Sequence, residues 1–212
     1  MRPALRAIAM MALLGCGAPP CASSIACGEG LVCGLDGRCG ALDAPPGSRF
    51  AGSRWLEARD FGLATRDPSP LGDALGLGGP AGSEARLAFG PLPPPSRILR
   101  AVLVLHPWDP DARVDAPGEI VIEHVEPFRG GRRPARLSRT PAAFAAARRA
   151  LPRGPARPVR IDLSALVAAA AGRADRTLYL LVRLEGGDPA GVRFASPWSP
   201  TSPGPRLELM LH

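Results

Sequence analysis

Four cysteines at a constant spacing are the residues whose type and position most clearly imply chemistry. Cys21, Cys27, Cys33 and Cys39 follow one another at intervals of six residues, and no further cysteine follows them. An even number of thiols in one short segment is typical of two disulfides formed in an oxidising compartment, and three pairings are possible. Zinc binding is the alternative, although zinc modules usually place cysteines as close pairs and no His lies near this segment. The spacing therefore predicts a small segment held by disulfides.

The segment before these cysteines predicts export and lipidation. Two Arg residues precede an unbroken apolar run at residues 7–14, which is far shorter than the ~20 residues that a membrane-spanning helix needs. The run ends in Leu-Leu-Gly-Cys at Cys16, which resembles the lipobox of bacterial lipoproteins. The resemblance implies that residues 1–15 are a signal peptide and that Cys16 carries lipid. The lipid would anchor the protein to the cell envelope, and we expect the membrane to be the outer membrane. An ordinary secretory signal cut near Ala18 is the alternative.

The cysteine-rich segment, residues 16–40, is too short to build a core of its own. Its pattern from Cys27 to Cys39, Cys-x5-Cys-Gly-x-Asp-Gly-Arg-Cys, resembles small modules that follow the lipobox in many lipoproteins of Gram-negative bacteria. This resemblance implies display at the cell surface rather than chemistry. Residues 41–53 contain Pro-Pro-Gly, which continues no regular element, and we expect them to be a linker that separates the segment from the domain that follows.

Residues 54–212 consist of short apolar runs between Gly and Pro residues, which predicts an all-β fold, an antiparallel β-sandwich or jelly roll. Ile98–His106 is the strongest candidate strand, and because it is apolar on both faces we expect it to be central in a sheet. Val159, Ile161 and Leu163 alternate with polar residues, as in a half-buried strand. The other expected strands are Ala85–Phe89, Glu119–Val125, Leu178–Leu184, Val192–Ala195 and Arg206–Leu211.

One or two short helices are expected between the strands. Ala142–Leu151 is rich in Ala, follows Thr-Pro, which fits the start of a helix, and is stopped by Pro152. Ser164–Ala171 begins with a Ser that could cap a helix and ends at Gly172. Both segments are too short to be stable alone, so they must pack on the sheets.

Three motifs in the first half of this domain and three in the second occur in a recognisable order. They are Leu71-Gly-Asp-Ala-Leu-Gly-Leu-Gly, Ala85-Arg-Leu-Ala-Phe-Gly, Pro95-Ser-Arg-Ile-Leu-Arg-Ala-Val-Leu-Val-Leu-His, Val159-Arg-Ile-Asp-Leu-Ser-Ala-Leu-Val, Val192-Arg-Phe-Ala-Ser-Pro and Pro205-Arg-Leu-Glu-Leu. Their order resembles that of DNRLRE (disaggregatase-related) domains. The chain departs from the pattern in lacking the usual Trp in the helix near residues 168–171, and residues 129–157 match no motif of the family. The resemblance implies a jelly roll of extracellular proteins that in some cases binds carbohydrate.

Two tryptophans are the best candidates for contact with a sugar ring, because the apolar faces of sugars need flat aromatic surfaces. Trp108 and Trp198 both lie in Pro-rich loops. The alternative is that they fill the ends of the hydrophobic core.

A structural Ca²⁺ site is a weaker candidate. Four acids could supply its carboxylate ligands: Asp109, Asp111, Asp115 and Glu119. The alternative is that these acids form a solvated acidic turn.

No enzymatic motif is present in the sequence. It contains no Gly-x-Ser-x-Gly elbow and no phosphate-binding loop, and His106 and His124 end predicted strands, where a His is usually structural. The sequence leaves open a pair of carboxylates for glycoside cleavage, since a fold can bring distant acids together. We expect no catalytic residue, no cofactor and no enzyme activity.

The net charge of +7 could indicate a nucleic-acid partner. All 26 basic residues are Arg, however, they are scattered, their densest group lies at residues 129–139, and the chain has one Tyr for stacking on bases. We therefore expect a lipoprotein that binds a carbohydrate or a surface partner and no nucleic acid. The alternatives are a structural envelope protein without a ligand and, more remotely, a polysaccharide-active enzyme.

Overall fold

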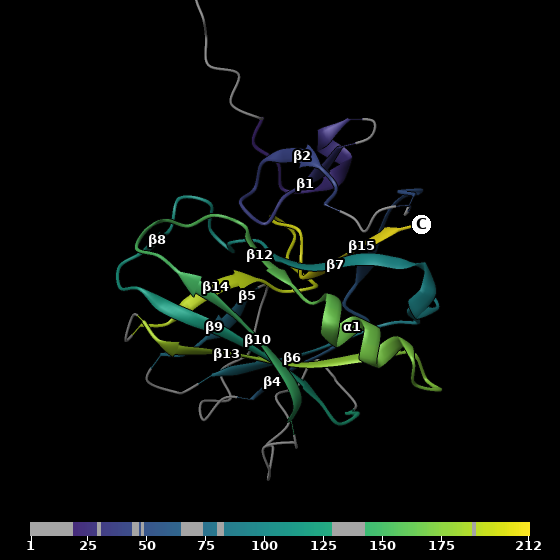
Figure 1. Cartoon of the computed structure of the whole chain (residues 1–212). Helices are drawn as coiled ribbons and strands as arrows, with labels where there is room; N and C mark the ends of the chain where they lie inside the picture. Colours follow the sequence, from purple (N-terminus) through teal and green to yellow (C-terminus); the bar gives the residue numbers. More distant parts are fainter. Residues whose placement is uncertain are drawn as a thin grey trace, which may run out of the picture.

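The strands form two facing antiparallel sheets, and a third, small layer covers one of them (Figure 1). The computed structural model describes residues 19–28, 31–43, 47, 49–64, 74–79, 83–128, 143–187 and 190–212, although not the side chains of residues 60–64 and 143–145. The predicted all-β sandwich is confirmed. Among the described helices, none has the length and apolar sequence needed to cross a bilayer.

The first sheet has four strands, in the order β12 (Val159–Asp162), β7 (Ile98–Leu105), β15 (Arg206–Leu211) and β3 (Gly52–Glu57). The second sheet has five, in the order β10 (Ala143–Leu151), β9 (Gly118–Val125), β13 (Leu178–Gly186), β6 (Glu84–Phe89) and β4 (Asp60–Ala64). Three short pairs complete the strands: β1 (Leu31–Cys33) with β2 (Cys39–Ala41), β5 (Ala74–Leu77) with β14 (Val192–Ala195), and β8 (Arg113–Val114) with β11 (Gly154–Pro155). The helical elements are η1 (Ser24–Cys27), η2 (Pro95–Arg97) and α1 (Ser164–Ala171).

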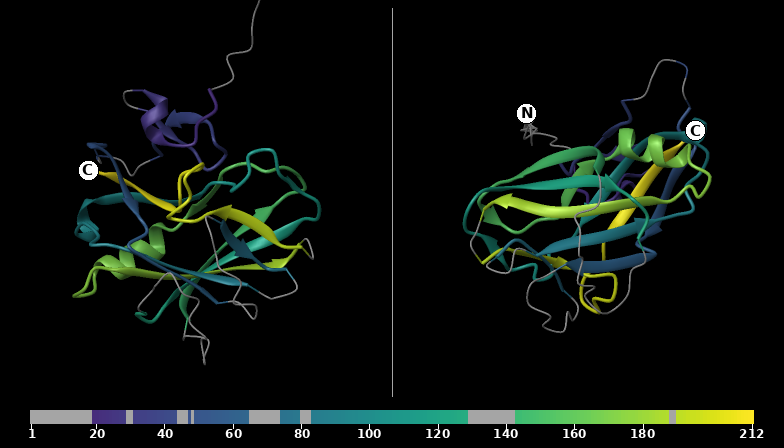
Figure 2. Two further views of the ribbon diagram at one scale, coloured as in Figure 1. Left: turned by 180° about the vertical axis from the view of Figure 1, so that it is seen from behind. Right: turned by 90° about the horizontal axis from the view of Figure 1, so that it is seen from below.

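The main hydrophobic core lies between the two sheets, and its members follow the two-residue period of strands. On β15, Leu207 and Leu209 are fully buried in this core and Leu211 packs against it, as the sequence predicted. The opposite sheet contributes Ile120 and Ile122 from β9. Figure 2 shows the two layers from behind and from below, with α1 beside them at one end.

The central strand β7 is apolar on both faces because it serves two cores. Ala101, Leu103 and Leu105 face the core between the sheets, whereas Val102 and Val104 belong to a second cluster on the outer face of the first sheet. Burial on both faces is what the continuous apolar run at residues 101–105 of this strand predicts. Its predicted central place in a sheet is thus confirmed, between β12 and β15.

The second cluster is covered by the cysteine-rich module, which we define as residues 19–41. Val32 of this module packs with Val102, Val104 and Met210 of the first sheet. Leu42 and Phe50, which follow the module in the region expected to be a linker, pack against the same cluster. The expectation of a separated module is therefore wrong: the module lies directly on the sheet, at the pole of the molecule shown at the top of Figure 1.

The segment Ala143–Leu151, for which the sequence predicted a helix, is the strand β10. It pairs antiparallel with β9 from Ala143, opposite Val125, to Leu151, opposite Gly118. Helix propensity is a weak preference that tertiary contacts override, and here the edge of the second sheet offers β10 a ladder of hydrogen bonds, with one shift of register between Ala143 and Ala145. The residues that were expected to start the helix lie outside the described part of the chain.

The second predicted helix, Ser164–Ala171, is confirmed as α1, with a different cap. Leu163 occupies the N-cap position, and Oδ1 of Asp162 accepts hydrogen bonds from the main-chain N–H and the hydroxyl of Ser164, at 2.9 and 2.6 Å. Ser164 Oγ in turn accepts the N–H of Ala101 on β7, at 3.1 Å. The Ser therefore fixes the helix to the first sheet, and the carboxylate next to it supplies the acceptor at the start of the helix.

Candidate ligand groove beside the cysteine-rich module

The four cysteines of the module form two disulfides, Cys21 with Cys33 and Cys27 with Cys39. The two disulfide loops interleave, because Cys27 lies in the sequence between Cys21 and Cys33, and Cys33 lies between Cys27 and Cys39. The Sγ atoms of Cys21, Cys27 and Cys39 lie within 4.8 Å of one another, a spacing at which free thiols could hold a metal ion. Since both bridges engage these sulfurs, disulfides account for the four residues, as the six-residue spacing predicted.

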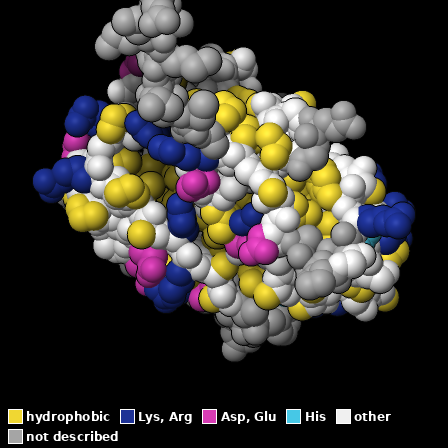
Figure 3. Space-filling model, turned by 45° about the horizontal axis from the view of Figure 1, so that its top comes forward, with side chains coloured by type: hydrophobic (Ala, Val, Ile, Leu, Met, Phe, Trp, Pro, Cys, Tyr) yellow, Lys and Arg dark blue, Asp and Glu magenta, His cyan; other side chains and the backbone are white. Residues whose placement is uncertain are grey.

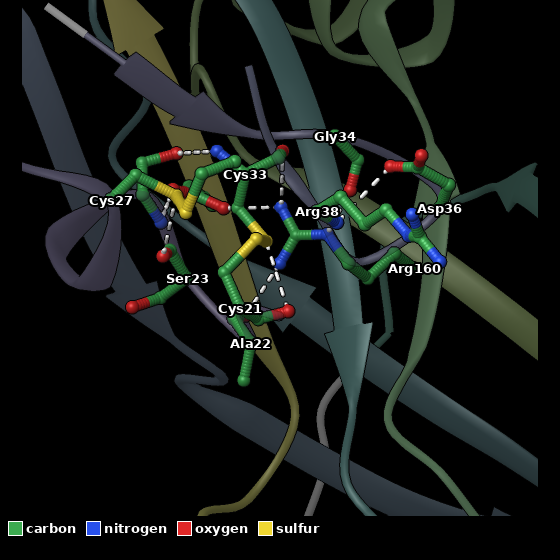
Figure 4. Close-up of a disulfide and its surroundings, with 12 residues drawn as sticks. Cys21, Ala22, Ser23, Cys27, Cys33, Gly34, Asp36, Arg38 and Arg160 are labelled. Atoms are coloured by element: carbon green, nitrogen blue, oxygen red, sulfur yellow. Dashed lines mark hydrogen bonds and ion pairs between the residues drawn. A yellow bond between two sulfur atoms is a disulfide. The ribbon is translucent and has the colours of Figure 1, made fainter. Parts of the chain in front are cut away.

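A buried guanidinium joins the module to the sandwich (Figure 4). Only 2% of the Arg160 side chain is exposed, and its Nη2 lies 2.7 Å from Oε2 of Glu208, which is fully buried. The other oxygen of Glu208 accepts the N–H of Ser24 in the module, at 2.8 Å. Arg160 also donates to three carbonyl oxygens of the module, those of Ala22, Cys33 and Gly34. A buried ion pair needs such additional hydrogen bonds, because desolvation of the two charges is costly.

A groove of about 730 Å³ opens where the module meets the edge of the sandwich. One wall comes from the module, at Pro20–Ala22 and Leu35–Gly37. The other wall comes from residues 149–152, 155–160 and 192–194, together with Pro107 and Val114. In the space-filling view, hydrophobic side chains lie in hollows of this face and Arg side chains lie beside them (Figure 3). The volume is within the range of small-molecule pockets, about 300–1,000 Å³.

The groove carries an excess of positive charge. Three exposed Arg side chains line it: Arg149 from β10, Arg157 before β12 and Arg193 from β14. Within the described residues, none of the three forms an ion pair with a carboxylate. Asp36 is the only acid among the described lining residues. Guanidinium groups that lack a carboxylate partner favour an anionic ligand, to which they can donate paired hydrogen bonds.

One of these Arg residues spans the groove. The Nη2 atom of Arg149 lies 3.4 Å from the carbonyl oxygen of Leu35, so β10 and the module are in contact across it. In a strand, Arg149 shares a face with Ala147 and Leu151, which pack in or against the main core. The face of β10 that packs on the core therefore also carries Arg149, the residue that contacts the module at the groove.

Neither of the predicted tryptophans lines this groove, although Trp108 directly follows a lining residue, Pro107. Trp108 is half-buried, its main-chain N–H donates to the carbonyl oxygen of Arg193 at 3.2 Å, and the Arg193 guanidinium carbon lies 5.9 Å from the centre of its ring. Trp198, in the loop after β14, is 42% exposed and is therefore not a core residue. A third tryptophan, Trp55, packs against the second cluster. Trp108 therefore supports a guanidinium of the groove, whereas Trp198 offers an aromatic surface to solvent.

A row of alternating charges crosses the outer face of the second sheet. Glu119 and Glu185 lie directly opposite each other on β9 and β13, and Arg148 donates to both carboxylates. Arg183 pairs with Glu123 at 3.1 Å and with Glu185 at 3.0 Å. The hydrogen bond from Arg148 lowers the pKa of Glu185, whereas a general acid for glycoside cleavage needs a raised pKa. These paired acids therefore stabilise the sheet and do not resemble a catalytic pair.

The histidines are structural in position. His124 is 3% exposed, and burial lowers its pKa, as it does for His106. Each lies at or near the end of its strand.

The four acids considered for Ca²⁺ are not assembled into a group. Asp109 Oδ1 accepts the N–H of Asp111 at 2.9 Å, which closes a turn, and Glu119 is held by Arg148. In the part of the chain that the structure describes, no three of Asp109, Asp111, Asp115 and Glu119 come close enough to share an ion. The solvated acidic turn is therefore the better interpretation of this segment.

The residues that make the groove have no distinctive pattern in the sequence. The alternation in β12 predicts an exposed Arg160, and the Arg residues that line the groove are scattered along the chain. Cys16 and the Arg-rich residues 129–139 lie outside the described residues. No protein-family model matches the chain, and no curated protein matches it. Membership of a lipoprotein family or of the DNRLRE family therefore stays a prediction from the sequence motifs.

Proposed function

We propose that this chain is a non-enzymatic lipoprotein of the cell envelope that binds an acidic oligosaccharide in the groove beside the cysteine-rich module. The observation that carries the proposal is the set of Arg149, Arg157 and Arg193 around one groove, without carboxylate partners among the described residues. Exposed proline rings in the lining, such as Pro155 and Pro158, give apolar surface for the CH faces of sugar rings.

Lipid anchoring is supported by the sequence around Cys16, and display outside the cytoplasm by the two disulfides. The DNRLRE-like motifs favour a carbohydrate among anionic ligands. Trp198 could extend the binding surface beyond the groove, because its ring is exposed in a loop that follows Arg193.

A glycan array that holds acidic and neutral oligosaccharides tests the proposal with the mature chain. We expect acidic members to bind and their neutral counterparts to bind far less. For the strongest acidic ligand, Arg157→Ala and Arg193→Ala should each lower the affinity about tenfold or more, since a hydrogen bond to a charged group contributes ~1.5–3 kcal/mol. Affinity should also fall as salt is raised, because the charged side chains are exposed.

Arg153→Ala is the matched control. Arg153 is an exposed Arg in the same stretch of chain, and it does not line the groove. If Arg153→Ala weakens binding as much as the groove variants do, the attraction is a general effect of positive charge. If no oligosaccharide binds, the structural alternative, an envelope protein without a ligand, replaces this proposal.

A further inference from the structure

Exposed apolar side chains gather on the cysteine-rich module. In the described residues, three large hydrophobic side chains are exposed, and two of them belong to this small segment: Ile25 at 71% and Leu31 at 38%. Ile25 lies on η1 and Leu31 begins β1, and these two elements pack against each other. Single exposed hydrophobic residues are common, but two on a module of this size indicate a surface that something covers.

The module is also nearly free of charge on its N-terminal side. From Cys16 to Leu35 the sequence holds one charged residue, Glu29, although 21% of the whole chain is charged. The charges of the module that the structure describes, Asp36 and Arg38, lie in the turn between β1 and β2. Absence of charge over so long a stretch lowers the cost of placing this surface at a lipid interface.

The chain permits little distance between the module and a lipid on Cys16. The described residues begin at Pro19, three positions after Cys16, and an extended chain covers at most ~3.6 Å per residue. The start of the module therefore stays within roughly 11 Å of the lipidated residue. Figure 1 shows the module at one pole, with the first sheet between it and the second sheet. It is thus the part of the molecule that a membrane would meet.

We propose that Ile25 and Leu31 form a membrane-contact surface that inserts into the headgroup region of the leaflet that holds the lipid anchor. This inference rests on the proposed lipidation of Cys16. A lipid anchor alone fixes position but not orientation; the added contact would hold the module against the bilayer, with the sandwich on its far side. The groove, which the module shares with the sandwich, would then open beside the membrane surface.

Quenching by brominated phospholipids tests the inference on the mature lipidated protein in phosphatidylethanolamine–phosphatidylglycerol vesicles. The variants Ile25→Trp and Leu31→Trp each add a fluorophore to the proposed surface. The control is Ala146→Trp, at an exposed position of β10 in the sheet farther from the module. If the Trp ring at position 25 or 31 lies about 5–10 Å deep in the interface, its added emission should shift to shorter wavelength than in water. Brominated phospholipid should quench this added emission. The emission added at 146 should be unaffected.

Equal quenching of all three added emissions, or of none, would overturn the inference. Mass spectrometry of the same preparations separates this from a failure of the proposed function. If Cys16 carries no acyl chain, the proposed anchoring is wrong and the membrane-contact surface is wrong with it. If Cys16 is acylated and the Trp at 25 and 31 are not quenched, the anchoring stands and only the contact surface is disproved.

Discussion

Arg160 shows what one residue contributes to both stability and architecture. Its place between Val159 and Ile161 on β12 gives it the outer face of the first sheet, where the sequence predicted exposure. The module covers that face, so the guanidinium is buried and satisfied by Glu208 and by carbonyl oxygens of the module. No periodicity in the strand itself reveals this, because the covering layer comes from more than a hundred residues away in the sequence.

Loss of one partner of this ion pair should destabilise the fold strongly. Arg160→Met leaves the carboxylate of Glu208 buried with only the N–H of Ser24, which should cost about 3–5 kcal/mol of unfolding free energy in a urea titration. The double variant Arg160→Met/Glu208→Met removes both charges and should be more stable than Arg160→Met alone. If the double variant loses as much unfolding free energy as Arg160→Met and Glu208→Met lose together, the two groups do not interact.

Among the elements, those with a strong apolar pattern could be predicted from sequence. The strands β6, β7, β9, β13, β14 and β15 and the helix α1 lie where the pattern placed them, within a few residues. The strand β10 could not be predicted, since Ala is a good helix former and the segment gains its strand conformation by pairing with β9. The groove could not be predicted either, because its two walls meet only when the module docks on the sheet.

The conformation of β10 can be tested with a pair of exposed Ala residues. Val favours strands and is less favourable than Ala in helices, by a few tenths of a kcal/mol to ~1 kcal/mol in each case. Ala146→Val on β10 should therefore raise the unfolding free energy, whereas Ala169→Val on α1 should lower it. Chemical denaturation measures both. A loss of stability from Ala146→Val equal to that from Ala169→Val would indicate that this segment is helical.

At the scale of the whole molecule, the disulfide-bonded module is a structural layer of the domain. It covers Val102, Val104 and Met210 and completes the partners of a buried ion pair. The sequence suggested that a linker at residues 41–53 makes the two parts independent, but Leu42 and Phe50 pack against the same cluster, and β3 begins at Gly52. The parts should therefore unfold together.

Reduction of the disulfides tests this dependence. Each bridge closes a loop of similar length, and loss of such a bridge typically costs ~2–4 kcal/mol. Because the module supports the first sheet and a reductant breaks both bridges, we expect it to lower the melting temperature of the sandwich by roughly 10–30 °C, as a single transition in calorimetry. If the sandwich melts at an unchanged temperature after complete reduction, confirmed by thiol titration, the module is not part of its cooperative unit.

The central claim is that one groove, built jointly by the module and the sandwich, binds an acidic oligosaccharide. The most direct measurement is a titration of the isotope-labelled mature chain with its strongest acidic ligand, followed by amide chemical shifts in NMR. We predict shifts on both walls, at Leu35–Gly37 of the module and at Ala156 and Arg193 of the sandwich, and their loss in Arg157→Ala. Shifts confined to the loop of Trp198, or no shifts at a saturating ligand concentration, would contradict the account.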